Sequence, residues 1–451
     1  MNESIKVSIG NPTSQLISPL LFGYNILYTY DTKDRWEDGW MAEKLKEVGA
    51  TTLRYPGGHI ASFWHWRKPY YPVNQDEWDP EVAAKYKEED LKKDYAHYLD
   101  LDSFMEWNRI INGTVLLGAN LVSGHRFGRV QDGIDEAVAL LKYCKGKNYN
   151  IEYMTLDNEV GHRPPEEHVP SELYPQYVRM YSEALKACDP NIKLICNYIH
   201  RLDSDQVKQL VRESGKYFDI YDHHWYYSNG KHGTFYQQNW LDDDLDWVRD
   251  QVKEFRAVCA ETGNEHLKLG FHEWNISPCR NGDAVTQFDQ AMVMADMLML
   301  FIEQNAFSAC VWPLYWPTET KPIEGADRPM LTRNLMDTKA HQINPPWHLM
   351  RMFRNTAGKK RMQTSSSNKN VVVLAAGGIA NEEMDLFVLN KSNLSQVVAI
   401  DGIASNAAIE GRQYIRDEAV VAKFVPSKMQ TTADSLQLIL EPLSLNYLRV
   451  K

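Results

Sequence analysis

Short apolar runs alternate with amphipathic stretches along the first three quarters of the chain. The amphipathic stretches have apolar residues at helical spacing, which predicts helices at 39–48, 102–111, 134–145, 172–187, 205–213, 245–260, 285–304 and 346–353. The apolar runs are typical of strands buried on both faces in a parallel sheet, and they predict strands at 16–25, 51–56, 114–121, 151–157, 193–199, 218–225, 267–274 and 307–316. Strands followed in this way by helices or long loops predict an α/β fold, a (β/α)8 TIM barrel with loop insertions.

The pattern changes after about residue 355. Short runs of alternating apolar and polar residues follow, separated by Ser, Asn and Gly, at 371–374, 384–389, 396–400, 436–441 and 445–450. Such runs predict a C-terminal antiparallel β-sandwich. The barrel does not need the run at 5–9, which is expected to add a strand to the sandwich. We therefore expect a catalytic barrel at 17–354 and an accessory β-sandwich at 355–451 that includes the N-terminal segment 1–16.

Length, charge and cysteine content narrow the class of protein. A chain of 451 residues has room for one large barrel and an appendage. The formal net charge of −11 argues against a general nucleic-acid binder, and no apolar stretch is long enough to predict a membrane span. The first residues have neither a basic nor an apolar region, so we expect a cytoplasmic protein, or a secreted or periplasmic one whose signal peptide has been removed. Six cysteines without a C-x-x-C pair predict buried free thiols and no structural zinc.

Two of the predicted strands end on a glutamate. One ends in Asn158-Glu159 and the other in His272-Glu273-Trp274. The active site of a TIM barrel lies at the carboxyl ends of its strands, so both carboxyls are expected at the barrel mouth. Retaining glycoside hydrolysis needs two such groups. Glu159 is expected to stay protonated, to protonate the leaving oxygen and later to deprotonate water, and Glu273 is expected to attack the anomeric carbon.

Other strand ends supply candidate substrate-binding residues. Each has a second interpretation: an ion pair for the arginine, a strand-end cap for an asparagine, ordinary packing for an aromatic ring. Since successive strand residues face opposite sides, His224 rather than His223 should point into the barrel. The aromatic insertion at 61–98 could wall a cleft or could simply pack loops. The candidates are Arg54, Asn120, Asn158, His224, Trp316 and, from the insertion, Trp66.

Basic residues gather in the loops that follow the predicted strands. They suit sulfate or carboxylate groups of an anionic substrate, or they pair with acids of the same loops. The basic residues are His125, Arg126, Arg129, His162, Arg163, His200, Arg201 and Arg280, and the acids are Asp132, Asp135, Glu166, Glu167 and Asp203.

Several motifs resemble clan A of the glycoside hydrolases, most closely the α-L-arabinofuranosidases of family 51, with family 39 and agarase-type enzymes as alternatives. The similar stretches are Ile17-Ser-Pro-Leu-Leu-Phe-Gly23, Leu53-Arg-Tyr-Pro-Gly-Gly58, Trp64-His-Trp66, Leu156-Asp-Asn-Glu159 and His272-Glu-Trp-Asn275. The resemblance implies that Glu159 is the acid/base and Glu273 the nucleophile, supported by Arg54 and Asn158.

Two positions depart from the arabinofuranosidase pattern. Where that pattern has a glutamate soon after its early glycine, this chain reads Gly23-Tyr-Asn-Ile-Leu27. Where it has asparagine after the double glycine, this chain has His59. The resemblance implies that both positions contact the terminal furanose. The expected activity is therefore arabinofuranosidase-like, or endo-acting on an anionic galactan such as agar or porphyran.

Two other functions remain open from the sequence. A metal-dependent TIM-barrel hydrolase or isomerase could draw its ligands from Asp157, Glu159, His223, His272 and Glu273. A non-catalytic carbohydrate-binding protein could keep the same fold. The glycosidase hypothesis requires no metal or organic cofactor. Its expected partner is an oligosaccharide or polysaccharide, with no nucleic acid or membrane involved.

Overall fold

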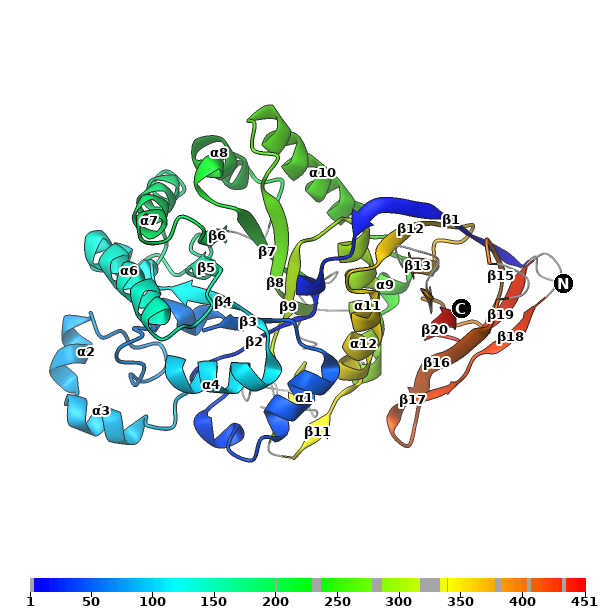
Figure 1. The fold of residues 1–451 in the computed structure, drawn as a ribbon, viewed down its shortest axis with the longest axis horizontal. Coiled ribbons are helices and arrows are strands. Elements are labelled where there is room, and N and C mark those ends of the chain that lie inside the picture. The colour runs from blue at the N-terminus through cyan, green and yellow to red at the C-terminus, as the bar shows by residue number, and fades with distance from the viewer. Residues whose placement is uncertain are drawn as a thin grey trace.

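The structure, a computed structural model, describes residues 4–198, 201–228, 237–277, 286–316, 333–338, 340–377, 383–403, 407–431 and 435–451, with side chains undescribed at 237–239. Helices surround a central group of strands, and a large sheet lies beside them (Figure 1). None of the described helices is both long and apolar enough to cross a membrane.

The central strands form a closed parallel barrel in sequence order, which confirms the predicted TIM barrel. Most residues of these strands are buried, as the continuous apolar runs indicated. The strands are β2 (Gly23–Asn25), β3 (Thr52–Tyr55), β4 (Thr114–Ala119), β5 (Tyr153–Leu156), β6 (Lys193–Cys196), β7 (Ile220–Tyr227), β8 (Lys268–Ile276) and β9 (Ser308–Val311). A short pair, β10 (Met336–Asp337) and β11 (Gln342–Ile343), follows the barrel.

Three of the main helices, α4, α8 and α11, start at side-chain caps that the sequence supplies. The Asp100 carboxylate accepts the amide of Ser103 at 2.8 Å at the start of α4, and Thr286 and Asp289 form a reciprocal capping box on α11. The main helices are α1 (Trp40–Val48), α4 (Leu101–Ile111), α6 (Val130–Gly146), α7 (Tyr174–Cys188), α8 (Asp205–Ser214), α10 (Asp246–Glu261), α11 (Gln287–Glu303) and α12 (Pro345–Phe353).

Shorter helices occupy the loops. Four are α-helical: α2 (Pro80–Lys85) and α3 (Glu88–Asp94) in the aromatic insertion, α5 (Val122–Arg126) and α9 (Gln237–Asp242). The 3-10 turns are η1 (Pro19–Leu21), η2 (Lys33–Arg35), η3 (His59–Phe63), η4 (Gly215–Tyr217) and η7 (Arg354–Thr356).

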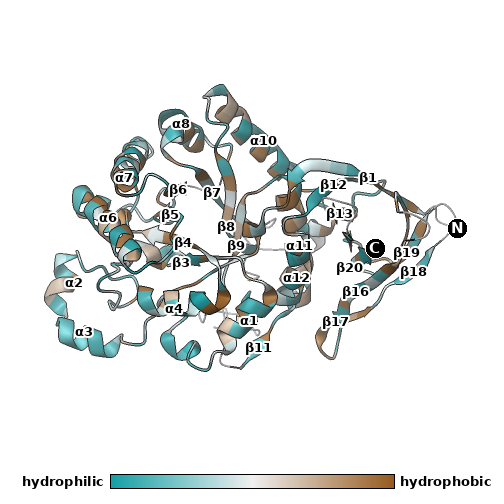
Figure 2. Ribbon diagram, viewed as in Figure 1, coloured by the Kyte–Doolittle hydropathy of each residue, from teal (hydrophilic) through white to brown (hydrophobic). Residues whose placement is uncertain are grey.

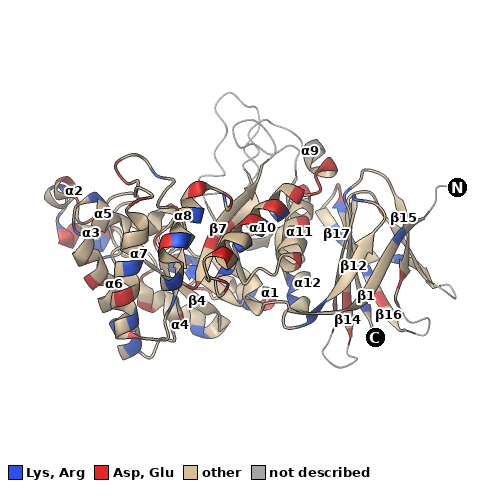
Figure 3. Ribbon diagram, turned by 90° about the horizontal axis from the view of Figure 1, so that it is seen from above, with Lys and Arg blue, Asp and Glu red and all other residues tan. Residues whose placement is uncertain are grey.

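Hydropathy and charge follow the layers. In Figure 2 the barrel strands mix brown with white and teal, and the outer helices alternate brown and teal. Acidic and basic residues share the outward faces of α6 and α10 (Figure 3). Helix α11 is the exception among the helices, because nearly all of its residues are buried. It packs between the barrel and the large sheet.

The large sheet has the strand order β17-β16-β20-β14-β13-β12-β1-β15-β19-β18, and all of its pairs are antiparallel except β1 with β15. Its strands confirm the predicted β-sandwich domain. They are β1 (Ile5–Leu16), β12 (Lys360–Ser366), β13 (Val371–Gly377), β14 (Met384–Asn390), β15 (Gln396–Asp401), β16 (Ile409–Asp417), β17 (Val421–Pro426), β18 (Lys428–Thr431), β19 (Leu436–Leu440) and β20 (Ser444–Val450). We propose the division into 17–354 and 355–451 with 1–16, because β1 pairs only within this sheet.

One predicted strand is wrong. The run at 16–25 was expected to be a single buried strand, but it divides into the end of β1, the 3-10 turn η1 and the three-residue β2. The Ser18 hydroxyl accepts the amide of Leu20 at 3.2 Å, and Pro19 occupies the first position of the turn. This cap and proline break the run before it reaches the barrel. The cysteine prediction is confirmed where it can be examined: the five described cysteines are free, and four of them are buried.

Candidate active site

The two glutamates meet across the barrel mouth. Glu273 lies within β8, and Glu159 follows β5 after a sharp turn. One carboxylate oxygen of each lies within 4.8 Å of the other and of a ring nitrogen of His224. Retaining glycosidases hold their two carboxyl groups about 5–5.5 Å apart, whereas inverting enzymes leave room for a water between them. The spacing fits the retaining geometry.

The turn that delivers Glu159 is held by Asp157. Both residues have left-handed backbone conformations, with φ of 64° at Asp157 and 48° at Glu159, which costs a non-glycine residue about 1–2 kcal/mol each. The Asp157 carboxylate offsets this cost, because it accepts the amides of Leu121, Val122 and Asn158 at 2.7 Å each. Its oxygens are thus committed to the turn.

Arg54 and Glu273 form a buried ion pair. The Arg54 guanidinium donates to Glu273 Oε1 at 2.8 Å, to Asn25 Oδ1 at 3.0 Å and to Asn158 Oδ1 at 2.5 Å. Burial lowers the pKa of Arg54, but the charges of Glu273 and Asp222 and the hydrogen bond to Glu273 together outweigh it, so the net direction is upward. Tyr226 donates its hydroxyl to the second oxygen, Oε2 of Glu273, at 2.8 Å. Two donors therefore fix the orientation of this carboxylate.

His224 bridges the acids of the site. Its Nδ1 lies 2.8 Å from Glu159 Oε1 and 3.6 Å from Glu273 Oε2, and its Nε2 lies 3.1 Å from Asp222 Oδ2. Burial lowers the pKa of His224, but the charges of Glu273 and Asp222 overcome it and raise the pKa to about 10. Burial likewise raises the pKa of Asp222, but His272 and His224 hold it well below its usual range. The surrounding acids therefore favour the protonated form of His224.

Asp222 and Tyr226 were not among the sequence candidates. Both flank His224 at alternate positions of β7, and the strand period of two places all three on the same side. The same alternation turns His223 away, where its ring packs edge-on against Phe271 at 5.7 Å. The signal was present in the sequence as the i, i+2, i+4 pattern of Asp222, His224 and Tyr226.

The structure brings some predicted residues to the carboxylates and leaves others apart. Arg54, Asn158 and His224 join the network described above. None of the contacts among described residues links the remaining three to the glutamates. Asn120 bonds to Ser123 and the Trp64 carbonyl, Trp316 packs edge-on against Trp312 at 5.5 Å, and Trp66 packs against Tyr143 at 4.8 Å. These three keep their predicted binding roles only as predictions.

His59 lies at the edge of the site. It contacts the guanidinium of Arg163, which in turn donates to the Asn158 carbonyl at 3.0 Å. Burial, followed by the charge of Arg163, lowers the pKa of His59 to about 4, although Glu159 is near enough to oppose the shift. His59 is thus a neutral side chain close to Glu159, at the position where the resemblance implies sugar contact.

A metal ion does not suit this set of donors. Glu159, His224 and Glu273 could each offer one ligand atom. Metal ligands must be deprotonated, but the raised pKa of His224 keeps its proton on, and Arg54 already occupies one oxygen of Glu273. The ring nitrogens of His272 face Asp222 and Ser308 instead. The geometry therefore disfavours the metal-dependent alternative.

The described basic residues of the loops are engaged by partners in the protein. Arg129 pairs with Asp132 at 2.7 Å, Arg201 with Asp203 at 2.5 Å and Arg126 with Asp79 at 3.6 Å. His125 lies 3.0 Å from the His168 carbonyl, and Arg163 is bonded to the Asn158 carbonyl. His200 and Arg280 lie outside the described residues. This arrangement favours pairing within the loops over an anionic substrate.

Known proteins resemble this chain in sequence and in fold. No family model matches the chain. It is 25% identical over 283 residues to an intracellular exo-α-(1→5)-L-arabinofuranosidase of Acetivibrio thermocellus, covering 56% of this chain and 52% of that one. It is 30% identical over 294 residues to a probable α-L-arabinofuranosidase C of Aspergillus clavatus, covering 59% and 55%. The matches thus span about half the length of these curated relatives.

The whole fold matches solved structures. An α-L-arabinofuranosidase from Thermotoga maritima, in complex with arabinose, superposes with a TM-score of 0.73 at 15% identity, covering 99% of this chain and 100% of that one. A family 51 α-L-arabinofuranosidase from Bifidobacterium longum gives 0.73 at 14% identity, covering both chains completely. A family 44 xyloglucanase from Paenibacillus polymyxa gives 0.67 at 14% identity, again with full coverage. The chain is similar in sequence to α-L-arabinofuranosidases and shares the fold of the family 51 enzymes.

Proposed function

We propose that the protein is a retaining glycoside hydrolase resembling α-L-arabinofuranosidases, with Glu159 as acid/base and Glu273 as nucleophile. The observation that supports this most is the pair of carboxylate oxygens within 4.8 Å across the mouth of the closed barrel. The sequence relatives named above point to the same activity. No metal or organic cofactor enters the proposed reaction.

In the first step, Glu273 attacks the anomeric carbon while Glu159 donates its proton to the leaving oxygen, and a covalent glycosyl–enzyme forms. In the second step, Glu159 removes a proton from water, the water attacks the same carbon, and Glu273 is released. Arg54 and Tyr226 hold the attacking carboxylate in place. His224 contacts both glutamates and positions Glu159 beside the leaving oxygen.

The sugar is proposed to be a neutral furanoside rather than a unit of a sulfated galactan. Three arginines of the described loops, Arg126, Arg129 and Arg201, are each paired with a carboxylate. Because these cations are already engaged, the described loops do not favour the binding of sulfate. The departures at 23–27 and at His59 bear on which furanose fits. Residues 23–27 are all buried, whereas the side chain of His59 is exposed and could meet a substrate.

Two substitutions test the assigned roles. Glu273→Ala should lower turnover of an aryl α-L-arabinofuranoside by roughly a thousandfold or more, and so should Glu159→Ala on substrates with poor leaving groups. Added azide should restore turnover in both variants. The glycosyl azide produced should have inverted anomeric configuration with Glu273→Ala and retained configuration with Glu159→Ala. Glu166→Ala, an exposed glutamate in the same loop as Glu159, serves as the control.

Full activity of Glu273→Ala would contradict the catalytic proposal and favour the non-catalytic carbohydrate-binding alternative. Inversion of anomeric configuration by the wild-type protein, followed by NMR, would contradict the double-displacement route. A parallel panel of neutral and sulfated polysaccharides identifies the substrate class from the released products.

A further inference from the structure

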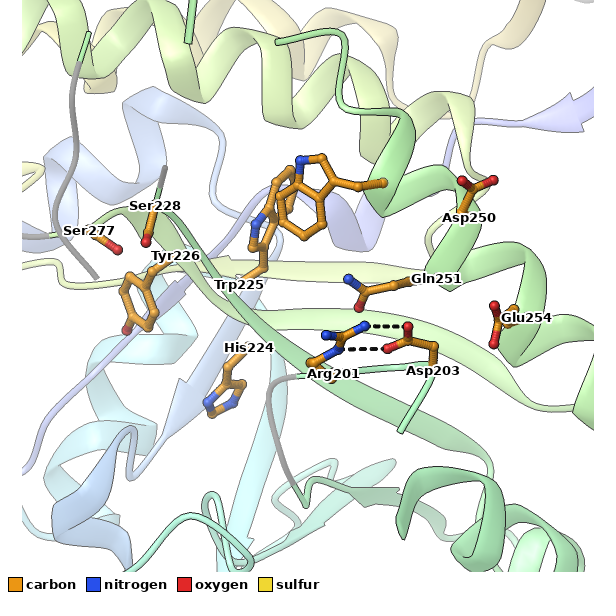
Figure 4. A pocket seen from close by; sticks show the side chains of 11 residues that line it. Arg201, Asp203, His224, Trp225, Tyr226, Ser228, Asp250, Gln251, Glu254 and Ser277 are labelled. Carbon is orange, nitrogen blue, oxygen red and sulfur yellow. Dashed lines mark hydrogen bonds and ion pairs between the residues drawn. The ribbon is translucent and has the colours of Figure 1, made fainter. Parts of the chain in front are cut away.

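Glu159 is held through its side chain and through its backbone. The His224 ring lies 2.8 Å from its carboxylate, and Figure 4 shows this ring in the lining of a hollow of about 880 Å³ at the end of β7. The backbone of Glu159 belongs to the left-handed turn that Asp157 holds, and its amide donates to Asn197 Oδ1 at 2.6 Å. The position of the proposed acid/base therefore depends in part on what fixes Asp157.

A short segment at 120–123 joins Asp157 to the aromatic insertion. Asp157 Oδ2 accepts two backbone amides of this segment at 2.7 Å each. The next residue, Ser123, is fully buried, and its hydroxyl donates to the Asp76 carboxylate of the insertion. Asn120 donates to the same hydroxyl at 2.8 Å, which helps to orient it. The amides that hold Asp157 and the hydroxyl that meets Asp76 thus belong to consecutive residues.

Asp76 is itself held by a buried histidine. Nε2 of His65 lies 3.0 Å from Asp76 Oδ1, and Nδ1 lies 2.8 Å from Glu136 Oε2 on α6 and 3.9 Å from Glu77 Oε1. The side chains of His65 and Asp76 are each 1% exposed. Burial lowers the pKa of His65, but the hydrogen bonds to Asp76 and Glu136 raise it to about 10. A histidine with a carboxylate at each ring nitrogen can donate to both, so it ties the insertion to α6.

A second contact leads from the insertion to Asp157. Ser62 lies three residues before His65, and its hydroxyl donates to Asp157 Oδ1. Arg163 donates to that hydroxyl at 2.5 Å. The insertion therefore reaches both carboxylate oxygens of Asp157, directly through Ser62 at Oδ1 and through the segment 120–123 at Oδ2.

We propose that His65 and Asp76 are positioning residues for Glu159, which act through Ser123 and Asp157. The aromatic insertion then supports the turn of the acid/base. The inference rests on the proposed hydrolase function and deepens it. Glu273 has its own donors, Arg54 and Tyr226, so the effect falls mainly on Glu159.

The test uses two substrates that share the reacting sugar and differ in the leaving group. A dinitrophenolate leaves without an acid, whereas the methyl α-L-arabinofuranoside needs Glu159 to protonate its leaving oxygen. For both substrates, kcat/KM reports transfer of the sugar to Glu273. Ser123→Ala should lower kcat/KM about tenfold or more on the methyl glycoside, as a misplaced catalytic group does, and about twofold at most on the dinitrophenyl glycoside. His65→Gln should show the same selective loss.

Asp296→Asn is the matched control. It disrupts a comparably buried ion pair, in which Lys391 Nζ lies 2.7 Å from Asp296 Oδ2, between α11 and the residue after β14. This variant should lower the melting temperature, because it leaves a buried charge without its partner. It should leave the ratio of the two kcat/KM values unchanged, which separates lost stability from lost positioning.

Equal losses on both substrates in Ser123→Ala and His65→Gln, or no loss on either, would overturn the positioning role. A wild-type protein that cleaves neither substrate contradicts the proposed hydrolase function itself. Hydrogen exchange distinguishes the two failures, since it needs no turnover. The amides of Leu121, Val122 and Asn158, which donate to Asp157, should exchange about tenfold faster in Ser123→Ala than in the wild type, and unchanged exchange at these amides would also overturn the inference.

Discussion

Deleting one member of the Arg54–Glu273 pair tests the architecture of the site without any substrate. The two side chains are 2% and 6% exposed, and their charged atoms lie 2.8 Å apart. At an effective dielectric constant of about 20, two unit charges 2.8 Å apart attract by about 6 kcal/mol. Much of this attraction offsets the cost of taking both charges out of water, so the pair as a whole contributes far less to stability.

Removing a single partner has a larger effect than that net contribution. The remaining charge stays buried without its counterion, which costs about 3–5 kcal/mol. Arg54→Met should therefore be strongly destabilised, and Glu273→Gln should be too, although its amide oxygen still accepts from Tyr226. The double variant buries neither charge. It should be more stable than the sum of the two single losses predicts, by about 2 kcal/mol or more.

Urea unfolding, followed by the fluorescence of the 13 tryptophans, measures the free energy of unfolding of the wild type, the two single variants and the double variant. The loss of the Asn25 and Asn158 contacts is common to Arg54→Met and to the double variant, so it cancels in the coupling energy. The exposed pair Arg179–Glu183, 2.9 Å apart, supplies the control: Arg179→Met should leave the urea midpoint nearly unchanged, because solvent screens both charges. An equally small change for Arg54→Met, or strict additivity in the double variant, would refute the reasoning.

Three further predictions follow from individual side chains. Tyr226→Phe removes one donor to Glu273 and should lower kcat by about 10- to 100-fold, the loss expected for a hydrogen bond to a charged group; an unchanged kcat contradicts that role. Because the pKa of His224 is raised to about 10, its stabilising contribution is complete below about pH 6.5 and lost as pH rises through 10, so melting scans of wild type and His224→Phe should converge at high pH. Burial raises the pKa of Asp31 to about 7, so its folded state loses stability as pH rises from about 4 to 7; Asp31→Asn, which keeps an acceptor for the Leu27 amide, should melt higher than wild type at pH 8 and equally at pH 4.

The barrel was predictable because its strands are buried on both faces. A continuous apolar run in the sequence indicates such a strand. The helices were predictable from their apolar spacing: the helix expected at 205–213 is found at Asp205–Ser214. Strands of the second sheet with exposed faces were harder to predict. Every residue of β18 (Lys428–Thr431) is exposed, and β12 (Lys360–Ser366) shows no buried position, so neither has an apolar period to read. Pairing with neighbouring strands, which the sequence does not display, determines these two.

A residue of the candidate site could be predicted from the sequence where its position depends on a single barrel strand. Arg54 and Glu273 lie in barrel strands and Glu159 follows β5 by three residues, and the closure of the barrel brings those positions together. The contact of His59 with Arg163 joins residues 104 positions apart through loops, and no local pattern reports it.

The surroundings of the two glutamates differ in ways that suit the two roles proposed for them. Glu273 is 6% exposed and accepts from both Arg54 and Tyr226, so its carboxyl group is held in one orientation, which suits the proposed attack on carbon. Glu159 is 17% exposed and faces His224, so water can reach it when it must give up and regain a proton. Arg54 is already bonded to Glu273, and His224 lies between Glu159 and Asp222. A neutral sugar enters such a site without adding an unpaired charge, whereas a sulfated one would bring a charge whose possible partners in the network are already engaged.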